Sequence, residues 1–245
     1  MTPRTGRIIR GTAAVLLFAA SALVALLLFA VAVLSDLEGA TFDPAIRGSA
    51  SLKSLRCPVF LSTSESGTVR ATFQNPLDRP LQYFVRVHVS EGFVTLYRQI
   101  DFQVPLDPGE SQTLEWEITD EDAAYGWLVL VKVLQSASHP LPSRSGSCGI
   151  PVVPVPFLSG NQFFGLLFGG SVVGMGAGIA FWRAVGRAEG QVRHDVSNAM
   201  IALGIALVVG TLVGLAISWI PGMVLLTGTV LMALAIVLYF LFKVE

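Results

Sequence analysis

The stretch AAVLLFAASALVALLLFAVAVL, residues 13–34, decides the fold class because it is an apolar run long enough to cross a lipid bilayer. As a helix its 22 residues would span about 33 Å, close to the thickness of a hydrocarbon core. Basic residues precede the run and acidic residues follow it: Arg4, Arg7, Arg10, Asp36 and Glu38. The positive-inside rule therefore places the amino terminus in the cytoplasm.

A cleaved signal peptide is the alternative interpretation of this run. Ala30-Val31-Ala32 has the small-x-small form of a cleavage site. The apolar run, however, continues through Val33 and Leu34 and is longer than the usual core of a signal peptide. We expect a retained transmembrane helix over residues 11–34.

Three further apolar segments predict three more transmembrane helices, over residues 159–182, 198–219 and 223–242. Pro221-Gly222 predicts a turn at 220–222, outside the membrane. The loop 183–197 contains Arg183, Arg187 and Arg193, which predicts that it is cytoplasmic. The tails 1–10 and 243–245 are then cytoplasmic too, residues 35–158 lie outside, and the host membrane is expected to be a bacterial cell membrane.

Composition agrees with an integral membrane protein. Hydrophobic residues make up 53% of the 245 residues, charged residues only 13%, and the mean hydropathy is +0.66. This balance excludes an ordinary soluble globule. The net charge is −1 and no part of the chain is strongly basic, so no nucleic-acid partner is expected.

Residues 35–158 change from continuous apolarity to alternation, which is typical of half-buried strands. The alternating apolar positions are Val69, Ala71, Phe73, Leu81, Tyr83, Val85, Val87, Val89, Ile100, Phe102, Val104, Leu114, Trp116 and Ile118. Turn residues separate these runs at 75–80, 91–92 and 107–110. The predicted fold class is four transmembrane α-helices with an extracytoplasmic antiparallel β-sandwich between the first two.

Residues 106–118, LDPGESQTLEWEI, resemble a strand entry of bacterial immunoglobulin-like modules of the CARDB and NEW3 type. The turn at 75–80, NPLDRP, is similar to another of their motifs. The resemblance covers only residues 75–118. It implies an extracellular binding or spacing module, and it brings no catalytic residues.

The only two cysteines, Cys57 and Cys148, both lie in the segment predicted to be outside, where disulfides form. We expect them to be bonded. A metal or redox pair is the alternative, but the chain has no Cys-x-x-Cys and no histidine beside either cysteine.

The sequence predicts no catalytic, cofactor-binding or metal-binding residue. His88, His139 and His194 fall in separate segments and are not expected to form one site. Residues 120–122, Asp-Glu-Asp, could be a calcium loop, but a solvated turn is the simpler interpretation.

Small residues recur every four positions in the second and third spans, and such rows are typical of close helix packing. The expected packing residues are Gly170, Gly174, Gly178, Ala206, Gly210 and Gly214. The rows could face other helices of this chain or those of a partner.

The spans contain no ionisable residue, which disfavours a pump or an ion-coupled transporter. The first functional hypothesis is a non-enzymatic envelope protein that is anchored in the lipid bilayer and binds a protein partner, as in an accessory subunit of a membrane complex. The alternative is a passive transporter or channel, with a route lined by Ser171, Thr211, Thr227 and Thr229. An enzyme outside the membrane would need a pocket with clustered ionisable groups.

Overall fold

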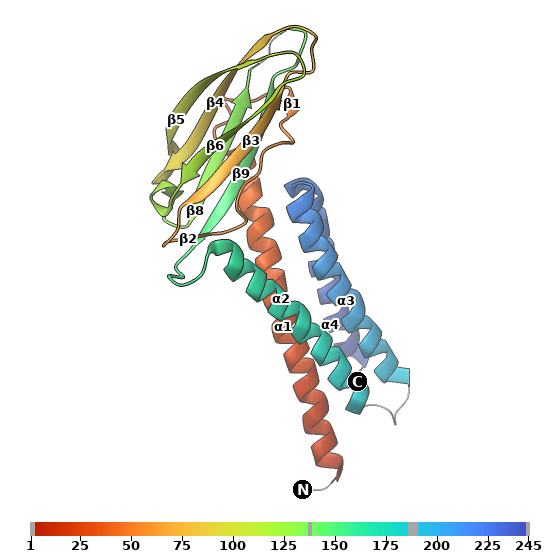
Figure 1. Ribbon diagram of the computed structural model, residues 1–245. Coiled ribbons are helices and arrows are strands. Elements are labelled where there is room, and N and C mark those ends of the chain that lie inside the picture. The colour runs from red at the N-terminus through yellow and green to blue at the C-terminus, as the bar shows by residue number, and fades with distance from the viewer. Residues whose placement is uncertain (1–2, 137–138, 186–190, 244–245) are drawn as a thin grey trace. The chain divides into compact units, whose positions relative to one another are not determined.

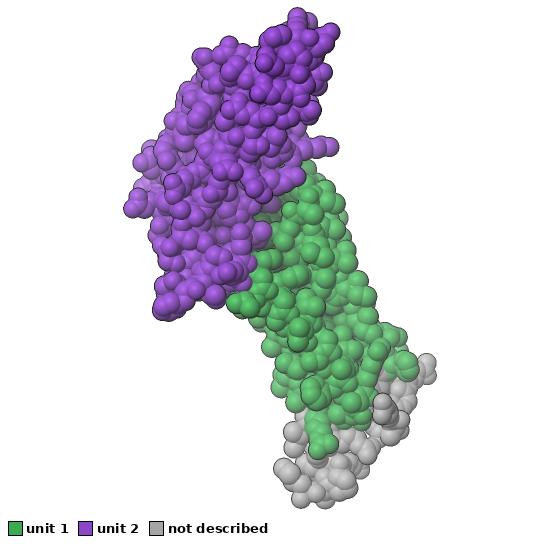
Figure 2. Space-filling view, viewed as in Figure 1, with its two compact units in different colours: residues 1–33, 164–245 green, residues 34–163 purple. Residues whose placement is uncertain are grey.

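The computed structural model describes residues 3–136, 139–185 and 191–243, and its elements run in the order helix, β region, three helices (Figure 1). The chain divides into two compact units (Figure 2). Residues 1–33 and 164–245 form the helical unit, and residues 34–163 form the β unit.

Four helices are long and apolar enough to cross a membrane within the described ranges. The helices are α1 (Pro3–Thr41), α2 (Gly160–Val185), α3 (Gln191–Ala216) and α4 (Trp219–Lys243). Their candidate spanning segments are Arg10–Thr41, Gly160–Val185, His194–Ala216 and Trp219–Tyr239. The prediction of four apolar membrane-length helices is confirmed.

The helix ends differ from those predicted. The α1 helix continues to Thr41, through residues expected to be linker, and it takes in most of the predicted tail 1–10. Pro221 lies in the first turn of α4, where its missing N–H costs no hydrogen bond, so the predicted turn at 220–222 is wrong and the break falls at 217–218. The predicted loop 183–197 is largely helical, and its residues 186–190 lie outside the described part of the chain.

The β unit contains nine strands in its described residues. They are β1 (Ala50–Ser51), β2 (Leu61–Ser62), β3 (Gly67–Gln74), β4 (Leu81–Glu91), β5 (Phe93–Leu106), β6 (Ser111–Ile118), β7 (Ala123–Ala124), β8 (Leu128–Gln135) and β9 (Arg144–Val153). Seven form one sheet with the main order β1-β9-β8-β4-β5, in which β2 also pairs with β9 and β7 with β8. The strands β3 and β6 form a separate two-stranded ribbon.

The predicted fold class, an antiparallel β-sandwich between the first two spans, is wrong. The seven-stranded sheet is mixed, because β1 and β2 both run parallel to β9. These strands are two residues long, too short for alternation to reveal them. They form because the segment after α1 runs alongside β9 in the same direction, which places Ala50 opposite Arg144 and Leu61 opposite Val152.

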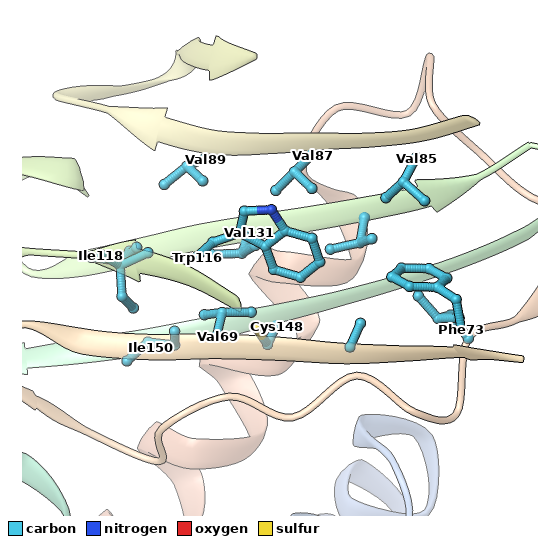
Figure 3. Packing of buried hydrophobic residues seen from close by; sticks show 14 of the residues in the cluster. Val69, Phe73, Val85, Val87, Val89, Trp116, Ile118, Val131, Cys148 and Ile150 are labelled. Carbon is cyan, nitrogen blue, oxygen red and sulfur yellow. The ribbon is translucent and has the colours of Figure 1, made fainter. Parts of the chain in front are cut away.

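The core of the β unit lies between the β3–β6 ribbon and the seven-stranded sheet. Figure 3 shows Val85, Val87 and Val89 of β4 in a row, facing the side chains of Phe73 and Trp116 from the ribbon. The predicted alternation of β3 is confirmed, since every second residue from Gly67 is buried. Burying this apolar surface is what holds the two layers together.

The opposite face of the sheet is covered by the end of α1 and the segment after it. A Cβ on Gly149 of β9 would collide with the backbone of Ser35, and one on Gly39 would lie 2.5 Å from the carbonyl carbon of Cys148. Glycine on both sides therefore lets the helix backbone lie directly on the strand. Farther along, Phe42 is buried with Leu130 of β8.

Candidate functional site

An open polar cleft lies in the β unit where β3 and β8 end and where β6 and β9 begin. Its volume is about 560 Å³. We call it the cationic cleft, and its lining residues are Ala50, Ser51, Leu52, Lys53, Ser54, Thr72, Gln74, Ser111, Gln135 and Arg144. The pairing of Ala50 with Arg144 and of Gln74 with Ser111 brings these distant segments to one end of the β unit.

The charge of the cleft is positive. Lys53 and Arg144 supply two cations, and the lining residues include no aspartate or glutamate. The other polar lining groups are hydroxyls and side-chain amides. Ammonium, guanidinium, hydroxyl and amide N–H groups are hydrogen-bond donors, so the cleft suits a ligand rich in acceptor oxygens, such as a carboxylate.

Ser54 contributes a hydroxyl that has no hydrogen-bond partner in the described structure. Its Oγ is buried, and the residue lines the cleft. A buried hydroxyl without a partner carries a desolvation cost. A bound group that hydrogen-bonds Ser54 would remove this cost, and this independent feature points to the same place.

Tyr83 supports the floor of the cleft from the core side of β4. Its hydroxyl donates to the carbonyl of Gln74 at 3.1 Å, and the side chain of Gln135 also hydrogen-bonds Tyr83. Burial raises the pKa of Tyr83 above its ordinary value of 10.0, although the charge of Arg144 and the bond from Gln135 oppose this rise. The phenol is therefore a neutral donor that fixes the position of two lining residues.

A second polar cluster lies under the segment after α1, and it is closed. His88 is buried, its Nδ1 lies 2.5 Å from Asp43 Oδ2, and its Nε2 lies 3.1 Å from Gln99 Oε1. Tyr97 stacks on the imidazole with 4.1 Å between ring centroids. Both ring nitrogens are thus engaged, so His88 holds the segment after α1 against the sheet and is not available to a ligand.

Lys132 belongs to the same cluster. Its Nζ donates to the carbonyl oxygen of Phe42 at 2.5 Å. Burial lowers the pKa of Lys132, Asp43 opposes this shift, and Arg47 adds to it. The sequence places His88 and Lys132 in strand segments, but only the course of residues 42–47 shows that both are covered.

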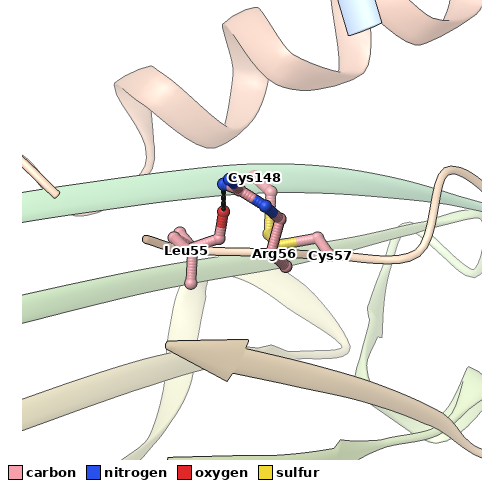
Figure 4. Close-up of a disulfide and its surroundings, with 4 residues drawn as sticks. All are labelled: Leu55, Arg56, Cys57 and Cys148. Atoms are coloured by element: carbon pink, nitrogen blue, oxygen red, sulfur yellow. Dashed lines mark hydrogen bonds between the residues drawn. A yellow bond between two sulfur atoms is a disulfide. The ribbon is translucent and has the colours of Figure 1, made fainter. Parts of the chain in front are cut away.

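The disulfide between Cys57 and Cys148 is present, with Cα atoms 6.6 Å apart (Figure 4). It joins β9 to the segment between β1 and β2 and closes a sequence separation of 91 residues. Beside it, Arg56 donates to the carbonyl of Leu55 at 2.9 Å and its backbone forms an isolated bridge with Arg70. The cysteines therefore have a structural partner in each other.

The small-residue rows of α2 and α3 meet α1. A Cβ on Gly174 would collide with Ser21, one on Gly178 would lie 2.8 Å from Phe18, and one on Gly210 would lie 2.7 Å from the ring of Phe29. A Cβ on Gly214 would lie 3.1 Å from Val33. The rows thus lie against the first helix.

Two of the six predicted packing residues differ from the rest. A Cβ on Gly170 would meet nothing within 4 Å. Ala206 is half-buried, between the buried Leu207 on one side and the exposed Ile205 on the other. The close contacts are therefore concentrated in the middle of α2 and the second half of α3.

The hydroxyls that could line a route through the helical unit serve helix backbones instead. Ser171, Thr211 and Thr229 donate to the carbonyl oxygens of Leu167, Leu207 and Leu225, each four residues earlier, at 2.7 to 2.8 Å. A groove of about 330 Å³ between α1, α3 and α4 is lined by apolar residues apart from Thr229. Thr227 is exposed.

The acidic run at 120–122 forms a single 3-10 turn, η1 (Asp120–Asp122). One oxygen of Asp122 accepts the backbone N–H of Thr119 at 2.9 Å, and the other pairs with Arg98 at 3.0 Å. Among the described residues, histidine, cysteine and carboxylate side chains form no group of three that could hold a metal ion.

Comparison with known proteins gives no family. No family model matches the chain, and no curated protein matches it. A β-glucosidase from Listeria innocua is similar over 40% of this chain and 15% of its own, with 19% identity and a TM-score of 0.29. A Bacteroides uniformis β-glucuronidase covers 39% of this chain and 12% of its own, with 15% identity and a TM-score of 0.30.

A Pseudomonas fluorescens alkylpurine DNA glycosylase bound to DNA is similar over 40% of this chain and 29% of its own, with 18% identity and a TM-score of 0.30. This chain therefore matches less than a third of the length of each of these three proteins. Likeness at this level shows nothing about activity.

Proposed function

We propose that this chain is a non-enzymatic, membrane-anchored binding protein that holds a protein partner through the cationic cleft of its β unit. The partner would present an acidic segment, and the chain would act as an accessory subunit of a larger membrane complex. The observation that carries the proposal is the cleft itself, with Lys53, Arg144 and the unpartnered Ser54 hydroxyl facing a space lined by no carboxylate.

Binding fits this cleft better than catalysis does. Its lining residues include no histidine, cysteine or carboxylate to act as a base or as an activated nucleophile. Two lining residues, Gln74 and Gln135, are held in place by hydrogen bonds with the buried Tyr83. A fixed set of donors with open access is what a carboxylate-bearing segment needs.

The helices are proposed to serve as an anchor. The alternative, a passive transporter or channel, requires hydroxyls that converge on a route through the helical unit. Three of the four candidate hydroxyls are instead bonded to their own helix, which disfavours that alternative.

The test is co-purification from native membranes in mild detergent, with the parent protein, a Lys53→Glu/Arg144→Glu variant and an Arg70→Glu control. Arg70 is an exposed cation on β3 outside the lining of the cationic cleft. A partner should copurify with the parent and with Arg70→Glu and should be lost from the double variant. Equal recovery of the same proteins with all three would contradict binding at this cleft.

A further inference from the structure

We infer that the β unit touches the lipid bilayer itself, through an aromatic rim formed by Phe93, Tyr125, Trp127 and Phe157. The inference goes beyond partner binding, and it rests on the proposed insertion of the helices in a membrane. The bilayer contact lies in the interfacial layer of lipid headgroups and upper acyl chains, where aromatic side chains collect.

All four aromatic residues of the rim have at least half of their surface exposed. The exposed fractions are 61% for Phe93, 60% for Tyr125, 50% for Trp127 and 92% for Phe157. A single exposed aromatic residue is unremarkable, but several on adjoining segments of one surface mark an interaction site.

The four side chains belong to segments joined at one end of the β unit. The backbone N–H of Tyr125 donates to the carbonyl of Gly92 at 2.9 Å, which places Tyr125 beside Phe93. The backbone N–H of Val152 donates to the carbonyl of Trp127 at 2.8 Å, which ties Trp127 to the strand that leads to Phe157.

The turn that carries Tyr125 adopts a backbone that a side chain disfavours. Tyr125 has φ +57° and the next residue, Gly126, has φ +72°. Glycine tolerates this left-handed region, whereas tyrosine does not adopt it readily. The phenol that the turn displays is exposed, so burial of the ring does not offset the strain.

This end of the β unit is also where the chain leaves for the membrane. Helix α2 begins at Gly160, three residues after Phe157, so the two Cα atoms lie at most about 11 Å apart. The other connection is at the same end: Phe42, the residue after α1, packs with Leu128, the neighbour of Trp127. The link to α2 therefore adjoins the rim, and the residue after α1 packs beside it.

The chemistry of the rim selects the bilayer as the occupant. Tryptophan and tyrosine combine an apolar ring with a polar group and favour the membrane–water boundary. Glu91 and Glu121 are exposed beside the rim, and the nearby exposed Arg98 is paired with Asp122 at 3.0 Å, so the local charge does not favour attraction to anionic headgroups. The contact is an apolar one, and it should not depend on ionic strength.

The experiment measures quenching of a fluorophore by phosphatidylcholine spin-labelled near the headgroup, with the full chain in phosphatidylcholine nanodiscs. No free cysteine exists in the protein, so a bimane label reacts only with an introduced thiol. The rim positions are Trp127→Cys and Phe157→Cys. Trp127→Cys is the stricter of the two, because Trp127 is far from α2 along the chain.

Two control positions are used, one in the β unit away from the rim and one within a candidate span. Phe84→Cys replaces an exposed aromatic residue near the start of β4, at the end of the strand away from the rim. Leu231→Cys lies in the middle of α4, and 61% of the Leu231 side chain is exposed. We expect strong quenching at both rim positions, little at Phe84→Cys, and strong quenching at Leu231→Cys only when the spin label is deep in the acyl chain. High salt should leave the rim signal unchanged.

A failure of the rim contact can be distinguished from a failure of the membrane anchor. If Leu231→Cys is quenched by the deep label while Trp127→Cys behaves like Phe84→Cys, the rim does not touch lipid and the inference falls, whereas the anchor stands. If Leu231→Cys is not quenched by either lipid, both the anchor and the rim contact are overturned. Loss of rim quenching at high salt would contradict apolar docking.

Discussion

Gly149 is the residue on which the contact between α1 and the sheet depends most. Gly149→Ala would drive a methyl group into the backbone of Ser35, which cannot move without lifting the helix end. We predict a loss of about 1 to 3 kcal/mol in the stability of the β unit, as for other overpacked sites. Hydrogen exchange at the amides of residues 35–42 should become faster.

Gly146→Ala on the same strand is the matched control. Its added Cβ would lie 3.0 Å from the end of the flexible Leu55 side chain and 3.2 Å from the carbonyl oxygen of Leu52, and it would not meet α1. Protection of residues 35–42 should stay near that of the parent. Equal exchange in Gly149→Ala and Gly146→Ala would show that the helix end does not rest on Gly149.

Lys132 predicts a pH dependence of stability. Burial lowers its pKa in the folded protein, so between that value and the ordinary 10.5 the unfolded chain binds more protons than the folded one. The free energy of unfolding should therefore rise with pH over this window. Urea unfolding at several pH values below 10.5 should show this slope in the parent and a smaller slope in Lys132→Met; an unchanged slope would contradict it.

Among the elements, α2 offers a direct test of the small-residue row. Gly174→Leu should overpack the contact with Ser21 of α1, at a cost of about 1 to 3 kcal/mol. Gly170→Leu is the same change one turn earlier, where a Cβ meets nothing within 4 Å, and it should be tolerated. Thermal stability in detergent distinguishes the two, and equal stability would mean that α2 does not pack closely at Gly174.

The disulfide joins β9 to the segment between β1 and β2, and its removal should loosen the β unit. The chain-entropy model gives about 4 to 5 kcal/mol for a closed loop of this length. Cys57→Ser/Cys148→Ser should therefore unfold the β unit at lower urea concentration while membrane insertion is unaffected. Fluorescence of Trp116, buried in the core, would report unfolding; a variant as stable as the parent would contradict this role.

The elements also show what a sequence can predict. The alternating strands, the four apolar helices and the cysteine pair followed from period, length and location. The strands β1 and β2 could not be predicted, because two residues carry no period and their partner β9 lies about 90 residues away. The parallel pairing that overturned the predicted antiparallel sandwich was hidden for the same reason.

The cationic cleft was beyond prediction on similar grounds. Lys53, Gln135 and Arg144 come from different segments, and only strand pairing brings them together. The cover over His88 was missed because α1 continues to Thr41 and its extension reads as linker. The resemblance to CARDB and NEW3 modules stays a prediction.

For the whole molecule, we expect the four spans to hold the β unit outside the cell. Two segments with three arginines each, the predicted tail 1–10 and the loop 183–197, support this orientation through the positive-inside rule, and Lys243 follows the last span. The cleft can meet an external partner, and the cysteines can meet an oxidising environment, only if the β unit lies outside the cell.

Labelling of intact cells with a membrane-impermeant thiol reagent tests on which side of the membrane the β unit lies. Asp78→Cys places a thiol in the exposed turn between β3 and β4, and Gly190→Cys places one in the predicted cytoplasmic loop, outside the described residues. The native cysteines are bonded and should not react. We predict that Asp78→Cys is labelled in intact cells and Gly190→Cys only after lysis; labelling of Gly190→Cys alone in intact cells would show the opposite orientation.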